Sequence, residues 1–594
     1  MPKTPEVNFN FVNNNVEQSV PLLGVSHVLA RTTKGPFNDP SELISSYAQF
    51  QRIFGKEIVP NGTISNIKVA LDMGAKLRVS RVAGKGDTSL GTAKTLNGNS
   101  AAYLKLTLAS LDGEITEVFF DIKTREAGSS IVNSEQEGTN ANWYLKLVSS
   151  NDAPTYQCEL NQYLKLVDDL SDSESLFTSE TIWFGGRGDT DADYYFNLDT
   201  FRSFVSNSKF IQVLYNKSLN SSLAANSIED VFALLDNLKN KAFGELTFIS
   251  GEALSSTSDP GLGVIMINEG SNGGDSDLST WVEAYEASAE YTDAYELICS
   301  HLAQHLPNDY KSIYAAIGTL VSKNKEVQLY VDIPAYTMDA NTGVITPITD
   351  PELILNDLRE AVKTIGKSEF INYYVGGIKY YDNNGILRNC DTNGTVLGLA
   401  CISATSKGPW YSFAGQNRGL VPNALGPVMS NLGPSSRKED LQKIADWFGN
   451  LFVIKDTRSN GKQTMLWHSF TSSPVNTSNK FISIVRTNLY IKKNVRPTLE
   501  SYIEEPNTWE TWKKIYYEAK EILDEMVGSA MSEYTWIGDQ FATSYSELQV
   551  NNEADVRQGK YKIVLRYKDI VTLQEVTMDI VIDSVSKEIE ISNE

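Results

Sequence analysis

The chain has 594 residues, of which 41% are hydrophobic and 10% aromatic. This size predicts several domains, and the aromatic content excludes long disorder. A formal net charge of -22 disfavours nucleic acid as the primary partner. The first residues lack a signal-peptide layout, and no apolar run approaches the roughly 18 residues of a membrane helix. We expect a protein made in the cytoplasm, with no nucleic acid partner and no direct membrane insertion.

The first segment, residues 1–20, is rich in asparagine and polar throughout. Within it Val7, Phe9 and Phe11 alternate with polar residues, as in a strand without a nearby partner. We therefore expect an extended N-terminal arm.

Residues 21–85 have the texture of an α/β domain. A helix is expected to open at Ser41, because apolar residues follow it at helical spacing, and to stop at Gly55. A second helix and a strand follow before residue 85, so this stretch is interpreted as the first part of an α/β core.

Residues 86–245 have a different pattern, in which apolar and polar residues alternate around Asp-Gly and Asn-rich turns. Period-two alternation is typical of antiparallel hairpins. We expect an inserted β-rich domain that protrudes from the α/β core.

The α/β texture resumes over residues 246–475. Helical patterns cover residues 280–306 and 352–366, and residues 327–335 have the composition of a buried strand. With the first part, this stretch predicts an open sheet covered by helices.

Residues 476–594 form the last unit. Two helices are expected, over 481–495 and 507–528, and the second carries a continuous apolar stripe. Strand patterns follow, so the unit is interpreted as an α+β domain ending in a terminal strand arm. The whole chain is thus predicted to be an α/β and β multidomain protein.

Catalytic and metal sites find little support in the sequence. His301 and His305 are four residues apart near Cys299, a spacing that suits one metal ion, but the zinc-protease glutamate between them is missing. Two polar positions on an amphipathic helix are the favoured interpretation. The four cysteines are scattered without a CxxC pair and predict no disulfide framework.

Two short motifs are also discounted. The run Ala361–Ser368 resembles a phosphate-binding loop, yet it ends a helix, with Gly366 as the expected C-cap, where a true loop would open one. The triplet Arg187-Gly188-Asp189 is frequent by chance and fits a turn. No acid/base pair stands out among the carboxylates, so we expect no enzyme, no metal and no cofactor.

Five stretches follow one another in a characteristic order along the chain. They are GPFNDPSELISSYAQFQRIFG and ALDMGAKLRVSRV near the N-terminus, GTVLGLACISATSKGPWYSF at 394–413, LQKIADWFGNLFVIKDTRSNGKQTMLWHSFTSS at 441–473 and EEPNTWETW at 504–512. Together they resemble the contractile phage tail sheath protein family. Each match is weak alone, and the shared order over about two thirds of the chain carries the resemblance. Residues 86–245 match no family pattern, and the double arginine expected in the C-terminal helix is here Val485-Arg486-Thr487.

The resemblance implies a sheath core of the α/β fold called subtilisin-like, without subtilisin chemistry. It implies a structural subunit that forms stacked six-fold rings around a tail tube and contracts to drive the tube through a host envelope. The implied partners are copies of the chain, the tail tube protein, and baseplate and tail terminator or neck proteins. The implied location is the tail of a virion, after assembly in the host cytoplasm.

A sheath must let its subunits slide without dissociating, and exchanged terminal strands allow this. We expect the arms to complete a sheet in adjacent subunits, with pairing inside their own subunit as the alternative. The candidate strand-exchange residues are Val7, Phe9, Phe11, Met578, Ile580, Ile582, Ile589 and Ile591.

A basic stripe in an acidic chain suggests a contact with the tube. Five cations occur in a stretch without an acid, and helical spacing predicts that they share an exposed face suited to a salt-sensitive grip on an acidic tube. A solvated helix face is the alternative. The candidates are Lys480, Arg486, Lys492, Lys493 and Arg496.

Two other functions remain open at this point. One is another multimeric virion protein, such as a capsid or fibre component. The other is a hydrolase or carbohydrate-binding protein with the β-rich insertion as its module. Within the sheath class, a phage tail, a bacteriocin and a secretion-type injector are not separated by the sequence.

Overall fold

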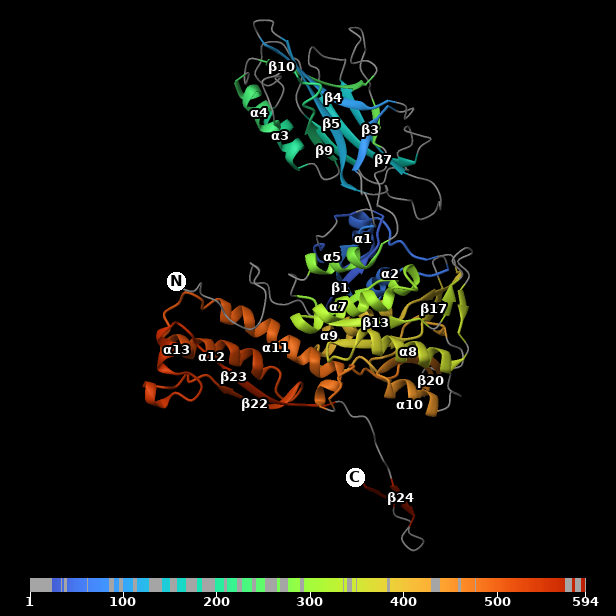
Figure 1. Ribbon diagram of the computed structural model, residues 1–594, viewed down its shortest axis with the longest axis vertical. Coiled ribbons are helices and arrows are strands. Elements are labelled where there is room, and N and C mark those ends of the chain that lie inside the picture. The colour runs from blue at the N-terminus through green and yellow to red at the C-terminus, as the bar shows by residue number, and fades with distance from the viewer. Residues whose placement is uncertain are drawn as a thin grey trace.

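Two large sheets organise the computed structural model (Figure 1). A seven-stranded sheet forms the centre of the α/β core, and a nine-stranded sheet forms the inserted domain. The structure describes residues 24–33, 35–36, 40–60, 62–84, 90–95, 100–110, 115–127, 141–149, 158–166, 179–183, 198–207, 211–221, 227–237, 242–251, 264–267, 276–288, 293–334, 336–338, 345–348, 350–381, 385–428, 438–457, 461–475, 477–571, 579–582 and 589–592.

The core sheet has the strand order β2-β1-β12-β13-β16-β20-β21. All neighbouring pairs are parallel except β20 and β21. The strands are β1 (Val25–Ala30), β2 (Lys76–Arg81), β12 (Glu296–Cys299), β13 (Gln328–Ile333), β16 (Ile371–Val375), β20 (Gly449–Thr457) and β21 (Gly461–Leu466). Because the chain runs from β1 outward to β2 and then returns to β12 on the other side, the strand order reverses between β1 and β12.

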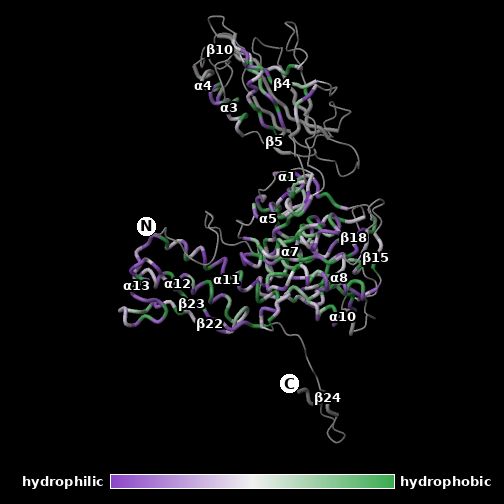
Figure 2. Tube along the Cα trace, viewed as in Figure 1, coloured by the Kyte–Doolittle hydropathy of each residue, from purple (hydrophilic) through white to green (hydrophobic). Residues whose placement is uncertain are grey.

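Helices cover both faces of this sheet, so β1, β12, β13 and β16 are buried throughout. One buried cluster joins the sheet to α1 (Tyr47–Phe54), α2 (Asn66–Asp72) and α9 (Thr392–Lys407). The other cluster, on the opposite face, joins it to α5 (Leu278–Ser288), α6 (Leu302–His305), α7 (Tyr310–Asn324), α8 (Pro351–Ile365) and α10 (Lys438–Asp446). Figure 2 shows the hydrophobic segments gathered where helices and sheet meet.

The inserted domain is an antiparallel sheet with two helices, α3 (Leu198–Asn207) and α4 (Ile228–Asn237). Its strand order is β10-β4-β5-β3-β11-β6-β7-β8, with β9 paired to β5. The strands are β3 (Leu90–Lys94), β4 (Ala102–Ser110), β5 (Ile115–Ala127), β6 (Ala141–Ser149), β7 (Cys158–Leu166), β8 (Ser179–Trp183), β9 (Ile211–Tyr215), β10 (Ala242–Ser250) and β11 (Val264–Ile267).

The expected end of this insertion at residue 245 is wrong. β10 runs past that position and pairs along its whole length with β4, and β11 pairs with β3 and β6. A strand pattern in the sequence does not say which sheet the strand joins. The insertion therefore extends to at least Ile267.

Short hairpins decorate the core. They are β14 (Tyr336–Met338) with β15 (Ile345–Pro347), and β17 (Ile378–Tyr381) with β18 (Leu387–Cys390) and β19 (Gly426–Pro427).

The C-terminal unit consists of two long helices, a two-stranded sheet and a terminal hairpin. The elements are α11 (Ile482–Glu500), α12 (Trp509–Asp524), β22 (Met531–Ile537), α13 (Glu553–Arg557), β23 (Val564–Asp569), β24 (Asp579–Ile582) and β25 (Ile589–Ser592). Val485, Leu489 and Leu523 belong to the same buried cluster as core residues on β12 and α7. The C-terminal unit thus shares a hydrophobic core with the α/β body.

Two helix predictions need correction. The helix expected from Ser41 begins at Tyr47, because Ser41 is buried and its hydroxyl accepts a hydrogen bond from the Val79 amide at 3.0 Å. The single helix expected over 280–306 is instead α5, strand β12 and the short α6. Three buried apolar residues in this parallel strand, Leu297 to Cys299, continue a helical stripe by chance.

No helix in the described ranges combines the length and apolarity that a bilayer crossing requires.

Candidate assembly site

The β22–β23 sheet is the main candidate for an assembly site. Tyr534 and Trp536 on β22 pack against the shared core, as do Leu565 and Tyr567 on β23. The opposite face is open to solvent. Neither β22 nor β23 pairs with another strand in the part of the chain that the structure describes. An isolated two-stranded sheet is marginal, and its open edges are templates for further strands.

The loop beyond β22 is fixed by one carboxylate. Asp539 accepts hydrogen bonds from the amides of Gln549, Val550 and Asn551 at 2.7, 3.0 and 2.8 Å. Burial alone raises the pKa of Asp539, but these donors outweigh it and lower the pKa below its ordinary value. This carboxylate therefore supports the end of the candidate sheet.

The terminal strands β24 and β25 pair with each other, from Asp579 opposite Ser592 to Ile582 opposite Ile589. Figure 1 shows β24 away from the rest of the C-terminal unit. Of the residues proposed for strand exchange, Ile580, Ile582, Ile589 and Ile591 lie in this hairpin. The remaining ones, Val7, Phe9, Phe11 and Met578, lie outside the described residues.

The predicted exposed basic stripe on α11 is wrong for Arg486. Its side chain is fully buried, and Nε lies 2.8 Å from a Glu296 carboxylate oxygen that is equally buried. The guanidinium also donates to the Ala400 carbonyl at 3.1 Å and lies over the Phe413 ring. Glu296 is on β12, so this cation fixes α11 to the central sheet.

Lys493 is also interior. It is 6% exposed, with Nζ 5.6 Å from the centre of the Tyr295 ring. Burial lowers the pKa of Lys493 to about 8, in spite of nearby carboxylates that raise it. The sequence pattern predicted an exposed face, whereas Arg486 and Lys493 meet the core. The acid that pairs with Arg486 is distant in the chain, so a local pattern does not reveal it.

Two further cations of the stripe are engaged with Glu326, at the end of α7. Lys492 lies 3.0 Å and Arg496 3.9 Å from its carboxylate, and Arg496 also pairs with Glu500 at 2.6 Å. Lys480 is exposed, with Nζ over the Phe481 ring at 5.1 Å.

The histidines that suggested a metal site have other partners. His301 is not helical but precedes α6 in the left-handed region at φ 52°, and its Nδ1 lies 2.9 Å from Asp391. His305 Nε2 lies 3.0 Å from the Ile58 carbonyl oxygen. Cys299 is a buried free thiol. The described residues contain no group of three side chains arranged to hold a metal ion.

The discounted phosphate-loop motif lies where the sequence placed it, at the end of α8. Gly366 is the C-cap at φ 103°, and its amide donates to the Val362 carbonyl at 3.1 Å, which confirms the helix-end interpretation. The Arg187-Gly188-Asp189 triplet lies outside the described residues.

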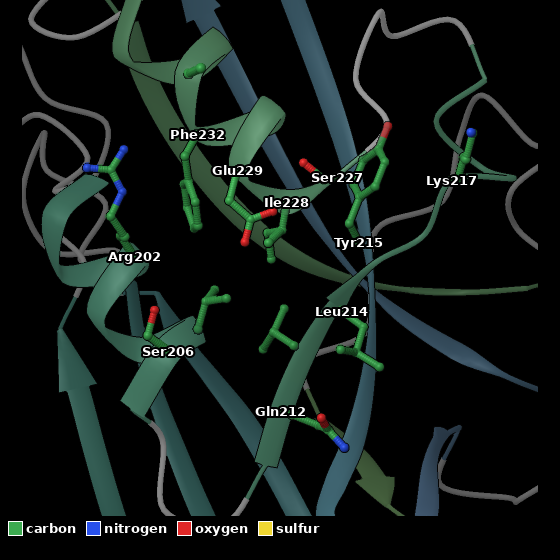
Figure 3. Close-up of a pocket in the computed structure, with 13 residues that line it drawn as sticks. Arg202, Ser206, Gln212, Leu214, Tyr215, Lys217, Ser227, Ile228, Glu229 and Phe232 are labelled. Carbon is green, nitrogen blue, oxygen red and sulfur yellow. The ribbon is translucent and has the colours of Figure 1, made fainter. Parts of the chain in front are cut away.

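A groove of about 980 Å³ in the inserted domain was not anticipated from the sequence. Figure 3 shows it between α3, α4 and strand β9. Glycoside hydrolysis in most families uses a pair of carboxylates, whereas Glu229 supplies the one carboxylate of the lining. Its neighbours Arg202 and Phe232 are stacked at 4.9 Å. The described lining residues thus include no carboxylate pair of the kind that most glycoside hydrolases use.

No family model and no curated protein matches the sequence. Among solved structures, the sheath tail protein from Listeria innocua is 10% identical, with a TM-score of 0.47 over 93% of this chain and 96% of that one. The sheath tail protein from Desulfitobacterium hafniense is 9% identical, with a TM-score of 0.45 over 94% and 100%. The anti-feeding prophage helical sheath in its contracted state is 14% identical, with a TM-score of 0.38 over 52% and 76%. The chain is thus similar to structural proteins of contractile sheaths, the class that its sequence motifs resemble.

Proposed function

We propose that this chain is the structural subunit of a contractile sheath, polymerising as stacked six-fold rings around a tube. The observation that carries the proposal is the β22–β23 sheet, whose two strands have no further strand partner among the described residues. Main-chain groups along an open edge bind an added strand, and alternate side chains give selectivity. In this role the chain is not an enzyme.

The terminal arms are the proposed donors of the added strands. The sequence of β25 alternates isoleucine with polar residues, as a strand with one buried face requires, whereas β24 has three consecutive apolar residues, Ile580 to Ile582. In the assembled sheath, the hairpin opens and its strands, with the N-terminal arm, extend the β22–β23 sheet of adjacent subunits. Such ties hold neighbours together while the linkers absorb sliding.

The proposed partners are the tail tube protein, baseplate proteins and the tail terminator or neck, in the tail of a virion or a similar particle. Because Arg486 and Lys493 are interior, the tube contact is proposed for Lys480, which is exposed. Lys492 and Arg496 would have to exchange Glu326 for an acidic tube group. Contraction would drive the tube through the host envelope.

Strand donation can be tested with peptides. A peptide of residues 576–594 should block polymerisation of the full chain, as followed by electron microscopy and light scattering, because it occupies the open edge first. The matched control peptide carries Ile589→Asp and Ile591→Asp, which keeps its length but removes the apolar side.

Deletion of residues 1–15 or 572–594 should leave a folded monomer with an unchanged circular dichroism spectrum and no sheath-like tubes. Normal tubes from both deletions, together with a peptide no better than its control, would end the strand-exchange proposal. A full chain that stays monomeric at high concentration would end the sheath proposal itself.

A further inference from the structure

A buried ionic cluster lies at the carboxyl end of β12, next to the point where the strand order reverses between β1 and β12. In open α/β sheets this position is the usual crevice for ligands. Here protein side chains fill it. His301 is at its centre, fully buried and held at φ 52°, a conformation that non-glycine residues rarely adopt.

Two carboxylates flank the imidazole of His301. Nδ1 lies 2.9 Å from Asp391, and Nε2 lies 4.0 Å from Glu57. Asp391 precedes α9, whereas Glu57 comes from the segment of residues 55–60 that follows α1. The imidazole thus connects two parts of the chain more than 300 residues apart.

Each carboxylate has further donors. Asp391 accepts from the Tyr336 hydroxyl at 2.5 Å and the Gln304 amide at 2.6 Å. Glu57 accepts from the Ser65 hydroxyl at 2.5 Å and from the Ser300 hydroxyl. These donors hold the carboxylates in place, but none of them carries a positive charge, so the charge balance depends on His301.

Burial alone disfavours a charged imidazole. Asp391 and, to a smaller extent, Glu57 and Asp332 outweigh burial and raise the pKa of His301 above its ordinary value of 6.5. For Asp391 the balance is reversed: burial raises its pKa, but His301 outweighs burial and lowers it. The proton on His301 and the charge on Asp391 therefore stabilise each other.

Other titratable groups also face the cluster, and the charge of Arg31 acts on His305 and contributes to lowering the pKa of that histidine. Burial raises the pKa values of Tyr336, Cys390 and Asp332, and burial with His301 lowers the pKa of His305 to about 3.

We propose that the cluster is a charge-operated latch, which holds residues 55–60 over the carboxyl edge of the sheet and opens when His301 loses its proton. With a neutral imidazole, Asp391 and Glu57 would lose the positive charge that lies between them, a loss that costs several kcal/mol in a buried site. The remaining ties of the segment include the Ile58 amide to the Arg31 carbonyl, 2.8 Å, and the Thr33 amide to the Lys56 carbonyl, 2.9 Å. We expect residues 55–60 to be the part of the cluster that detaches first.

The direction of the pH dependence follows from linkage. Folding raises the pKa of His301, so its contribution to stability is complete below pH 6.5 and is lost as pH rises through the raised pKa. Folding lowers the pKa of Asp391, so its contribution to stability is present above pH 3.8 and is lost as pH falls through the lowered pKa. The latch is therefore closed between the lowered pKa of Asp391 and the raised pKa of His301, and it opens as pH rises through the latter.

Hydrogen exchange at the Ile58 amide tests the latch in the full chain. After correction for the intrinsic rate, protection should be constant near pH 6. Above the His301 transition it should fall, by at most about tenfold per pH unit for a single proton. Asp391→Asn should move the transition to lower pH, because it removes the main partner of the proton.

His301→Gln should leave Ile58 weakly protected and independent of pH. The matched control is His468→Gln, because His468 is a partly buried histidine just after β21, with Nε2 2.9 Å from the Gly449 carbonyl oxygen; its profile should equal the wild type. A flat wild-type profile overturns the latch by itself, whether or not the variants fold. An alkaline fall that persists in His301→Gln also overturns it. Neither result depends on sheath assembly.

Discussion

Replacing Arg486 with methionine tests whether α11 is fixed to the core by a buried ion pair. Methionine keeps most of the volume but leaves the Glu296 carboxylate fully buried, with the Ser26 hydroxyl at 2.9 Å as a remaining donor. Removing one partner of such a pair costs about 3–5 kcal/mol. Burial already raises the pKa of Glu296, and Arg486 opposes that rise. In the variant the carboxyl group takes up a proton more readily, so the loss should shrink as pH falls.

The measurement is the free energy of unfolding in urea at pH 7.5 and pH 5, followed by tryptophan fluorescence. Lys480→Met is the matched control, because this lysine is exposed, and should change stability by less than about 0.5 kcal/mol. Adding Glu296→Gln to Arg486→Met should recover stability, since neither charge of this ion pair then remains buried. If Arg486→Met costs no more than Lys480→Met, the ion pair does not hold α11.

Three further results are expected. Asp539→Ala should lower the free energy of unfolding by about 2–4 kcal/mol at pH 7 and by less in acid. The pKa of Asp539 is lowered in the folded chain, so its carboxylate stabilises the fold at pH values above its ordinary pKa, and this stabilisation is lost as pH falls. Hydrogen exchange at residues 549–551 would report the loss. Gly394→Ala should lower the thermal midpoint, because a Cβ there would lie 2.5 Å from a backbone oxygen of α2; an unchanged midpoint would contradict this close packing. The thiols of Cys299, Cys390 and Cys401 should resist alkylation at pH 8 until urea unfolds the chain, because burial raises their pKa values. Mass spectrometry of the labelled peptides would show this.

The sequence predicted most elements whose signal is local. α11 and α12 lie where the apolar stripes placed them, and β13 lies within the predicted buried strand. The wrong assignments arose where the signal is not local. β12 continued a helical stripe, and β10 pairs with β4, which begins 140 residues earlier in the chain. Pairing partners at such a separation leave no trace in a pattern of ten residues.

The candidate site shows the same division. The sequence identified the cations of α11 and the strands that follow, but not the acids that turn the stripe inward. Glu296 and Glu326 are more than 150 residues from the lysines and arginines they meet. An unusual cluster of cations without a local acid is the one signal available, and it is compatible with either a distant acid or an exposed face.

The position of the insertion has a consequence for biosynthesis. Ser26 on β1 bonds Glu296 on β12 across 270 intervening positions. At a translation rate of about 5–20 residues per second, β1 waits about 15–50 s on the ribosome before β12, its neighbour on the side away from β2, has been made. The inserted domain has its own sheet and can fold during that time. Chaperones that shield β1 and β2 until β12 has been made should therefore have a strong effect on the yield of this protein. We expect this effect on yield to be larger than that of the stability of the finished fold.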